Sequence, residues 1–522
     1  MRGRKAYFDD EARERLLKGA ELLYKAVKST MGPNSGNAVI GNLPFAPHIT
    51  HDGVTVAKAM EIKPTKDNLG ESDGLELLKE TSIRMDDVAG DGTTTVTILA
   101  YHLLNEAHKL IKAGANPMVL RRQLEAATKT ALELLEEFRQ EVKEADIEHI
   151  ATISAGDKMI GKVIADIISE IGYDGEITLE EGKGMTIDSE IVNGYNFDSG
   201  YTSPYFITNQ SRQEAVLNNP YILLINRRVG FERDIFPILQ RVAESGHREL
   251  LIIADAVESE ALAAIVLNKE KKVINSVVVH APGGGDGRKK FLEDVSVLTG
   301  GKIIDTENGE EVSEITVEDL GRADKVIVTG KKTTIVGGRG NVESRVQELK
   351  DQMKTATVKE IPHLESRIAG LKGKVAIITV GGSTPPEVEE RKYRVEDAVK
   401  ATKAAIKEGI VPGGETALLW MSRNSFPVNK GAELLIFAMA QPFKILMENA
   451  GYSEDLSREI LNIGDGIDAT TGKKVDLYKE GIIDPALVTR EALLNAVSVA
   501  GVGMTMNVLI PEEPKDEIPQ GQ

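Results

Sequence analysis

Hydrophobic residues repeat with helical spacing at both ends of the chain, whereas its middle holds short β-branched runs between helical segments. Near the N-terminus, Ala12, Leu16 and Ala20 recur at steps of four residues, which places them on one face of a helix. Apolar runs such as 222–225 and 250–254 alternate with helical patterns, which is typical of an α/β layer domain. This order predicts a multi-domain α and α/β fold in which both ends of the chain share one domain and another domain interrupts it.

The same periodicity predicts the individual elements. Helices are predicted over 12–27, 75–88, 93–111, 121–142, 231–243 and 258–267, one or two more over 343–368, and mainly helical structure from Glu387 onward. Strands are predicted over 38–40, 54–56, 176–179, 187–192, 222–225, 250–254, 277–279, 325–328, 334–336 and 375–380.

Composition narrows the class of protein. A chain of 522 residues is long enough for three to four domains of roughly 150 residues each. The net charge of −18 argues against binding to DNA or RNA through phosphate neutralisation. With 0 Cys the chain has no disulfides and no thiolate metal sites. No apolar run approaches the roughly 18 residues of a membrane span, and no apolar segment follows the basic N-terminus, so we expect a soluble cytoplasmic protein without a secretory signal. Residues 511–522, rich in Pro and Glu, are expected to form a disordered tail.

Two glycine-rich stretches do not fit standard nucleotide motifs. The stretch from Gly156 to Lys162 is followed by Val163, so it lacks the magnesium-binding hydroxyl of a Walker A loop. The run 283–287 has the wrong spacing for a dinucleotide fingerprint.

The segment Gly90-Asp91-Gly92-Thr93-Thr94-Thr95 is a better candidate for a phosphate site. Two glycines permit a sharp turn, and the threonines then begin a long amphipathic helix whose free N–H groups and dipole favour a phosphate chain. The Asp91 carboxylate is a hard oxygen ligand for Mg²⁺. A plain Asp/Gly turn with threonine caps explains the same residues equally well.

Other acidic and glycine positions could complete such a site. The turn Thr30-Met31-Gly32-Pro33 ends the first helix, and Asp52-Gly53 is typical of a tight turn. Asp397 lies in an amphipathic helix, where a lone carboxylate is most often a solvated charge, and the loop 409–414 has room for a sugar or base or simply ends a helix. Spacing alone does not bring these segments together.

Several short strings, in this order, resemble the group I chaperonins, the bacterial and organellar 60 kDa chaperonin family. The resemblance extends from Arg13 to about Val508. The most specific strings are Thr30-Met31-Gly32-Pro33, Asp52-Gly53-Val54-Thr55-Val56-Ala57, the segment from Gly90 to Thr95, Gly200-Tyr201-Thr202-Ser203-Pro204-Tyr205-Phe206, the segment from Arg394 to Ala398, and Ile483-Asp484-Pro485.

The resemblance implies the chaperonin fold in three domains. A mainly α equatorial ATP-binding domain would take residues 1–135 and 409–522. A small intermediate hinge domain would take 136–192 and 376–408, and an α/β apical domain 193–375, with Gly194 and Gly373 at its hinges. The resemblance also implies seven-membered rings, usually two stacked, and a co-chaperonin lid. No extra apical protrusion of the group II kind is found.

The same resemblance implies roles for individual residues. Asp397 would be the carboxylate needed for ATP hydrolysis, with Asp52 assisting, and Asp91 would hold Mg²⁺. The residues implied to contact ATP are Thr30, Met31, Gly32, Pro33, His51, Asp91, Gly92, Thr93, Thr94, Thr95, Gly414, Asp468, Ala469, Thr470 and Asp484.

An apolar surface in the apical segment would bind non-native chains and the co-chaperonin, because an exposed apolar groove captures what a misfolded chain fails to bury. Periodicity alone favours another interpretation, in which the helical residues among them pack against the α/β sheet. The residues implied by the resemblance are Tyr201, Tyr205, Phe206, Phe236, Leu239, Leu262, Val266 and Leu267.

The chain departs from the family pattern at a few positions. His51 stands where Lys is usual, which puts a K⁺ requirement in question, and Lys374 replaces one of a hinge glycine pair. Glu415 stands where a third Gly is common, Asp468 where Asn is usual, and the C-terminal Gly-Gly-Met repeats are absent.

The sequence therefore predicts an ATP-driven folding machine that encloses non-native client proteins in a ring, with ATP and Mg²⁺ as cofactors and neither nucleic acid nor membrane as a partner. Two alternatives stay open: a scaffold that keeps the fold without cycling, and an ATPase that forms no ring.

Overall fold

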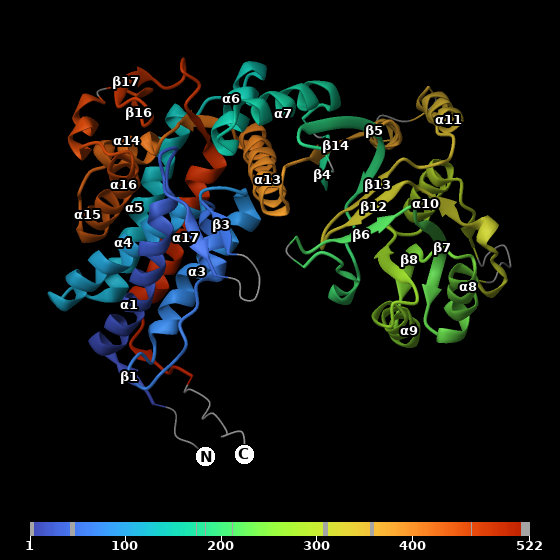
Figure 1. Cartoon of the computed structure of the whole chain (residues 1–522), viewed down its shortest axis with the longest axis horizontal. Coiled ribbons are helices and arrows are strands. Elements are labelled where there is room, and N and C mark those ends of the chain that lie inside the picture. The colour runs from blue at the N-terminus through green and yellow to red at the C-terminus, as the bar shows by residue number, and fades with distance from the viewer. Residues whose placement is uncertain are drawn as a thin grey trace. The chain divides into compact units, whose positions relative to one another are not determined.

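The computed structural model describes residues 5–41, 47–173, 175–182, 184–210, 212–305, 312–354, 356, 360–460 and 462–512. The chain divides into two compact units (Figure 1). Unit 1 consists of Met1–Ser169, Glu181–Ile187 and Thr379–Gln522, and unit 2 of Glu170–Glu180 and Asp188–Ile378. Both ends of the chain thus belong to unit 1. The boundaries of the three predicted domains remain a prediction, and most of the predicted tail lies outside the described residues.

Unit 1 is built mainly from helices, most of which pack around one large apolar core. Two of them approach unusually closely: a Cβ added to Gly74 would lie 1.8 Å from the Leu16 carbonyl oxygen, and one added to Gly19 would lie 1.7 Å from that of Glu71. The helices are α1 (Asp9–Val27), α2 (Gly53–Ala59), α3 (Glu71–Ala89), α4 (Thr93–Lys112), α5 (Pro117–Phe138), α6 (Glu144–Ala155), α7 (Lys158–Ile171, whose end enters unit 2), α13 (Pro385–Glu408), α14 (Thr416–Asn424), α15 (Lys430–Met439), α16 (Gln441–Asn449) and α17 (Ala486–Met504).

Unit 1 also contains short antiparallel strand pairs, of which β1–β19 and β15–β18 join distant segments and the other two are local hairpins. The first pairs the two ends of the chain, since Tyr7 lies opposite Leu509. The pairs are β1 (Tyr7–Phe8) with β19 (Val508–Leu509), β2 (Ala38–Ile40) with β3 (His48–Thr50), β15 (Ile410–Pro412) with β18 (Ile483–Pro485), and β16 (Asp465–Asp468) with β17 (Lys473–Asp476).

One strand prediction is wrong. Residues 54–56 belong to helix α2, although all three are β-branched. The Asp52 carboxylate caps this helix by accepting hydrogen bonds from the backbone N–H groups of Val54 and Thr55, at 3.2 and 2.8 Å. An aspartate N-cap of this kind stabilises a helix by about 1 kcal/mol, which outweighs the weak strand propensity of a few residues.

Helix α17 is long and apolar enough to cross a membrane by length and composition alone, which the search for apolar runs did not anticipate. Two thirds of it (67%) is buried, and it packs against α4, α3 and α5. It is therefore a core helix of unit 1.

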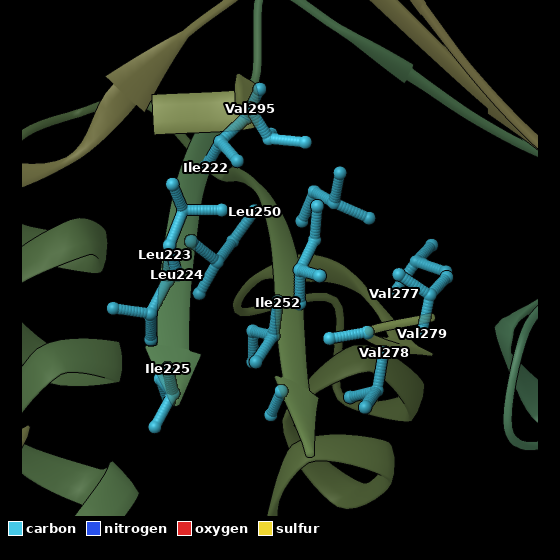
Figure 2. Packing of buried hydrophobic residues seen from close by; sticks show 14 of the residues in the cluster. Ile222, Leu223, Leu224, Ile225, Leu250, Ile252, Val277, Val278, Val279 and Val295 are labelled. Atoms are coloured by element: carbon cyan, nitrogen blue, oxygen red, sulfur yellow. The ribbon is translucent and has the colours of Figure 1, made fainter. Parts of the chain in front are cut away.

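Unit 2 is an α/β unit with two sheets. In one sheet β10, β7, β8 and β9 lie side by side and parallel, and β11 pairs antiparallel with β7. The central strands are buried along most of their length, which explains their continuous apolar runs (Figure 2). The elements are β7 (Tyr221–Val229), β8 (Glu249–Val257), β9 (Asn275–His280), β10 (Ile303–Ile304), β11 (Gly321–Arg322), α8 (Glu232–Glu244), α9 (Ser259–Glu270), α10 (Asp286–Thr299), α11 (Glu343–Met353) and α12 (Ile361–Leu371).

The second sheet has the order β4–β14–β5–β13–β12–β6. Its strands β5 and β14 meet near the predicted hinge, where the Gly194 N–H donates to the Gly373 carbonyl at 2.9 Å. A Cβ at Gly194 would lie 2.2 Å from Val375 Cγ2, so this contact requires glycine. The strands are β4 (Glu176–Glu181), β5 (Ile187–Phe197), β6 (Ala215–Asn218), β12 (Lys325–Val328), β13 (Thr333–Val336) and β14 (Lys374–Val380).

Candidate functional site

The predicted phosphate loop joins α3 to α4 in unit 1. Gly90 and Gly92 both adopt left-handed backbone conformations, with φ of 70° and 78°, and they turn the chain sharply between the two helices. Asp91 lies between them, and its Oδ1 accepts a hydrogen bond from the Gly92 N–H at 2.5 Å. Thr93 then begins α4, so the unpaired N–H groups of this helix start are next to the Asp91 carboxylate.

Two other segments reach the same loop. The Thr30 hydroxyl lies 3.2 Å from the Thr94 hydroxyl. A Cβ added to Gly53 would lie 2.4 Å from Thr94 Oγ1 and 3.1 Å from Thr93 Oγ1. The structure therefore brings together the turn after α1, the start of α2 and the start of α4, which the sequence could not show. Hydroxyls and helix starts from three segments form a polar cradle of the kind that suits phosphate oxygens.

The turn at Met31 is fixed by a residue that sequence reasoning missed. The side-chain amide of Asn449, at the end of α16, donates to the carbonyl oxygens of Lys28 and Met31 at 2.8 and 3.0 Å. Met31 itself is buried, while Gly32 and Pro33 continue the turn. No motif around Asn449 signals this role, because the contact depends on the packing of α16.

A hairpin end joins this turn. The Asn34 side chain donates to the Ala469 carbonyl at 3.2 Å. Next to it, Asp468 accepts hydrogen bonds from the Thr470 and Thr471 hydroxyls at 2.6 and 2.7 Å. Burial raises the pKa of Asp468, but these hydrogen bonds outweigh it and leave the pKa below its ordinary value. Asp468 is therefore ionised at neutral pH.

Carboxylates from distant parts of unit 1 interact electrostatically at this cradle. Burial raises the pKa of Asp91 and, more strongly, that of Asp397. The negative charge of Asp52 raises both further, and Asp91 also acts on Asp397. Asp397 is thus affected by the charges of Asp52 and Asp91, although it lies hundreds of positions from both in the sequence.

Two more acids adjoin them at the β15–β18 pair. Burial raises the pKa of Asp484 well above its ordinary value, and the charges of Glu415 and Asp91 add to this, whereas backbone N–H groups of Gly414 and Glu415 oppose it. Burial raises the pKa of Glu415 to about 7, although its Oε1 accepts a hydrogen bond from the Thr95 hydroxyl at 2.5 Å. Glu415 is noted in the sequence only as a departure from a family pattern, and the structure places it against the phosphate loop.

The acidic residues at the cradle are suited to binding a divalent cation. Among the described residues, no group of three or more His, Asp or Glu is arranged to hold a metal ion by itself. Asp91, however, has unfavourable interactions with Asp52 and Asp86, and Lys400 is the cation that opposes them. A hard cation that Asp91 shares with phosphate oxygens would relieve this repulsion, so the donor set fits Mg²⁺ bound together with a phosphate chain.

His51 lies at the edge of this region. Its Nδ1 is 3.7 Å from the Glu390 carboxylate on α13, and its side chain is partly exposed. The predicted nucleotide residues thus lie in four places of unit 1. These are the cradle around Thr30, Asp91 and Thr95, the β15–β18 pair with Gly414 and Asp484, the edge at His51, and the hairpin at Asp468, which contacts the turn after α1 through Asn34.

The predicted apolar residues of unit 2 do not share one environment. Tyr205, Phe236 and Leu267 are exposed, with 67%, 47% and 52% of their surface accessible. Tyr201, Leu262 and Val266 are partly buried against the core of unit 2.

Phe206 and Leu239 are 0% and 2% exposed. The expectation that they line an exposed groove is therefore wrong for this structure, because both side chains belong to the buried core of unit 2. Sequence reasoning missed Phe231, an exposed aromatic residue directly before α8.

Comparisons with known proteins agree with this architecture. The model of the TCP-1/cpn60 chaperonin family matches residues 23–514. The structure is similar to that of the chaperonin gp146 from bacteriophage EL 2 (Pseudomonas aeruginosa), determined in the presence of ATP-BeFx. Crystal form II of that protein gives a TM-score of 0.67 at 21% identity, over 97% of this chain and 99% of that chain. Crystal form I gives a TM-score of 0.63 at the same identity and coverage. At this identity the likeness concerns the fold.

Proposed function

The chain belongs to the TCP-1/cpn60 chaperonin family, and we propose that it is an ATP-driven chaperonin of the group I type that captures non-native proteins. The observation that carries this proposal is the meeting of Asp52, Asp91 and Asp397 at a cradle of glycine and threonine. Such a cluster of acids destabilises the folded protein, and a cation bound there with a phosphate chain would offset this destabilisation. The relative gp146 was crystallised in the presence of an ATP analogue, which supports the same ligand.

Unit 1 would hold ATP through several segments. The N–H groups and hydroxyls of Thr93, Thr94 and Thr95 and the turn from Thr30 to Pro33 would bind the phosphates. Asp91 would hold Mg²⁺, which supplies positive charge to the phosphate oxygens when bound. The ribose and adenine would contact the residues farther along unit 1, namely His51, Gly414, Asp468, Ala469, Thr470 and Asp484.

Asp397 would act on the attacking water. A carboxylate whose pKa is raised by burial and by neighbouring charges is a stronger proton acceptor than an ordinary aspartate. Asp52 has its carboxylate oriented by the N–H groups at the start of α2, so it would help to orient the water or the metal's ligands from a fixed position. Together these groups orient and deprotonate water at one end of the phosphate chain.

Unit 2 would bind the non-native client. Exposed Phe236 and Leu267 lie on α8 and α9, which pack against each other, and Tyr205 and Phe231 are further exposed aromatic residues of unit 2. Side chains of this kind bind apolar segments that a misfolded chain leaves in water. Tyr201, Leu262 and Val266 would contribute their accessible edges.

Assembly is part of the proposal. Val39, Ile49, Phe426 and Val428 are exposed apolar residues of unit 1, which supports contacts between copies of the chain. We propose seven-membered rings, two of them stacked, a separate co-chaperonin lid, three domains per subunit and a cytoplasmic location. The Tyr-x-Ser-Pro-Tyr-Phe string that begins at Tyr201 supports the group I type. The K⁺ requirement remains a prediction.

The test is hydrolysis of magnesium ATP by the purified wild-type chain and by Asp397→Asn. We expect the variant to bind magnesium ATP and to lose about 10²–10⁴-fold in kcat, the range expected for one acid–base group. Glu389→Gln, an equivalent loss of charge at an exposed position of the same helix, is the control and should hydrolyse ATP at the wild-type rate. A wild-type chain that neither binds nor hydrolyses ATP, or an Asp397→Asn rate equal to that of the wild type, would contradict the proposal and favour the scaffold alternative.

A further inference from the structure

Three different helices carry the three central carboxylates of unit 1. Asp52 caps the start of α2, Asp91 follows the end of α3, and Asp397 is part of α13. Like charges that face one another repel, so an attractive contact between these helices must offset the repulsion. The sequence offers no signal for it, because each helix lies in a different part of the chain.

One acidic residue on α3 contacts the other two helices. Asp86 lies in the last turn of α3, and its side chain is largely buried. Its Oδ1 accepts a hydrogen bond from the Lys400 ammonium on α13 at 2.9 Å, and its Oδ2 lies 3.6 Å from the Lys58 ammonium on α2. Lys58 is half exposed and contributes little, whereas the contact to Lys400 is the shorter and better shielded of the two.

A glycine at the end of α3 gives Lys400 the space to reach Asp86. The Lys400 stem crosses the end of α3 at Gly90, where an added Cβ would lie 2.2 Å from Lys400 Cβ and 2.4 Å from its Cδ. Only glycine permits α13 to lie this close to the phosphate loop. Lys400 also follows Asp397 by one helical turn, so the two side chains lie on neighbouring positions of the same helix surface.

The charge of Lys400 acts on the site itself. Its ammonium opposes the effect of the neighbouring acids on Asp91 and on Asp397. Burial tends to lower the pKa of Lys400, but the charges of Glu396 and Asp86 outweigh it and raise this pKa. Lys400 is therefore charged at neutral pH.

We propose that Asp86 and Lys400 form a clasp between α3 and α13, in which Lys400 is a positioning residue that holds Asp397 in place beside the phosphate loop. This inference rests on the proposed ATP hydrolysis, because it assigns a role in that reaction. The hydrogen bonds and ion pairs of Asp86 and Lys400 seen among the described residues join them to each other, to Lys58 and to Glu396, and not to the proposed phosphate ligands at Thr30 and Thr93. Loss of the clasp should therefore reduce the rate of the chemical step and leave nucleotide binding nearly unchanged.

The experiment compares Lys400→Met, Lys400→Arg and Asp86→Asn with the wild type. Methionine keeps the apolar stem over Gly90 and removes the charge. We expect Lys400→Met and Asp86→Asn each to lower kcat about ten-fold or more, with KM for ATP within about two-fold, because displacement of a reacting group by about 1 Å costs up to 10²-fold. The double variant should be little worse than Lys400→Met alone, since the Asp86 contact is already lost in that variant. Lys400→Arg, which keeps the positive charge and a long side chain, should keep most of the wild-type kcat.

A second measurement needs no nucleotide. Hydrogen exchange of the α13 segment around Asp397 should be faster in Lys400→Met than in the wild type, because the helix has lost its tie to α3. Lys407→Met, the same substitution at an exposed position of α13, should leave both exchange and kcat unchanged.

The outcomes separate the two proposals. A wild-type chain that does not hydrolyse ATP contradicts the proposed function. If the wild type hydrolyses ATP and Lys400→Met matches it in kcat and in exchange, the clasp is wrong while the function stands. A Lys400→Arg rate as low as that of Lys400→Met, or additive losses in the double variant, would also overturn the clasp.

Discussion

The backbone conformation and the pKa of Glu415 are both unusual for a glutamate. Its backbone is left-handed, with φ of 60°, a conformation that costs a residue with a side chain about 1–2 kcal/mol. Its carboxyl group lies against Thr95 and the charge of Asp91, and burial raises its pKa from 4.5 to about 7. A strained and buried acid at this position is an unfavourable choice for stability alone, which fits a residue retained at a binding site.

We predict that Glu415→Gln makes the nucleotide-free protein less sensitive to pH. In the wild type the folded state holds the Glu415 proton up to about pH 7, whereas the unfolded chain releases it near 4.5, so the free energy of unfolding falls as pH rises through this window. In the variant, the decrease in the free energy of unfolding between pH 5 and pH 7 should be smaller by about 1–3 kcal/mol. Urea unfolding at pH 5 and pH 7 can be followed by the fluorescence of Trp420. It is the single tryptophan of the chain and lies on α14, which begins directly after Glu415.

The matched control for this measurement is Glu389→Gln, at an exposed position. It should keep the wild-type pH dependence. An unchanged slope in Glu415→Gln would mean that Glu415 titrates at its ordinary pKa.

At the scale of elements, the crossing of α1 and α3 fixes the core of unit 1. These helices touch through Gly19 and Gly74, where even a methyl group would overlap a carbonyl oxygen of the partner helix. Helix contacts this close let the backbones pack without intervening side chains, and they leave no space for adjustment.

We predict that Gly74→Ala lowers the free energy of unfolding of unit 1 by about 1–3 kcal/mol, because overpacking must push α1 and α3 apart. Trp420 fluorescence in urea measures it. Gly36→Ala, at a glycine with no atom within 4 Å of the added Cβ, should shift the midpoint little. A Gly74→Ala midpoint equal to that of the wild type would show that the two helices separate at no cost.

Most elements could be predicted from the sequence because each depends on a local pattern. The apolar period of α1 and the buried runs of β7 and β8 are confirmed, and the long charged stretch 343–368 proves to be two helices. The error at 54–56 arose because a side-chain cap outside the run decides its conformation.

Contacts between distant segments could not be predicted in this way. The pairing of Asp86 with Lys400 and that of Asn449 with the turn at Met31 join residues that are hundreds of positions apart, so no spacing rule reveals them. The burial of Phe206 and Leu239 has the same cause, because residues from distant segments form the unit 2 core in which both side chains lie.

At the scale of the whole molecule, the proposed function requires unit 2 to capture clients through its exposed apolar side chains. We predict that Phe236→Ser and Leu267→Ser each weaken suppression of the aggregation of a denatured client, measured by light scattering, because both side chains are exposed on α8 and α9. Tyr173→Ser, at an exposed aromatic residue outside these helices, should suppress aggregation as well as the wild type.

Equal suppression by Phe236→Ser, Leu267→Ser and the wild type would place client binding elsewhere on the chain. It would leave the hydrolytic site in unit 1 intact, since none of the substituted residues belongs to that unit.

The most direct test of the link between the two activities follows a denatured client enzyme bound to the intact assembly, with and without magnesium ATP, and measures the return of the client's own activity. We expect the client to stay bound and inactive without nucleotide, to recover activity when magnesium ATP and a co-chaperonin are added, and to recover far more slowly with Asp397→Asn. Recovery that is equal with and without ATP would contradict an ATP-driven folding cycle.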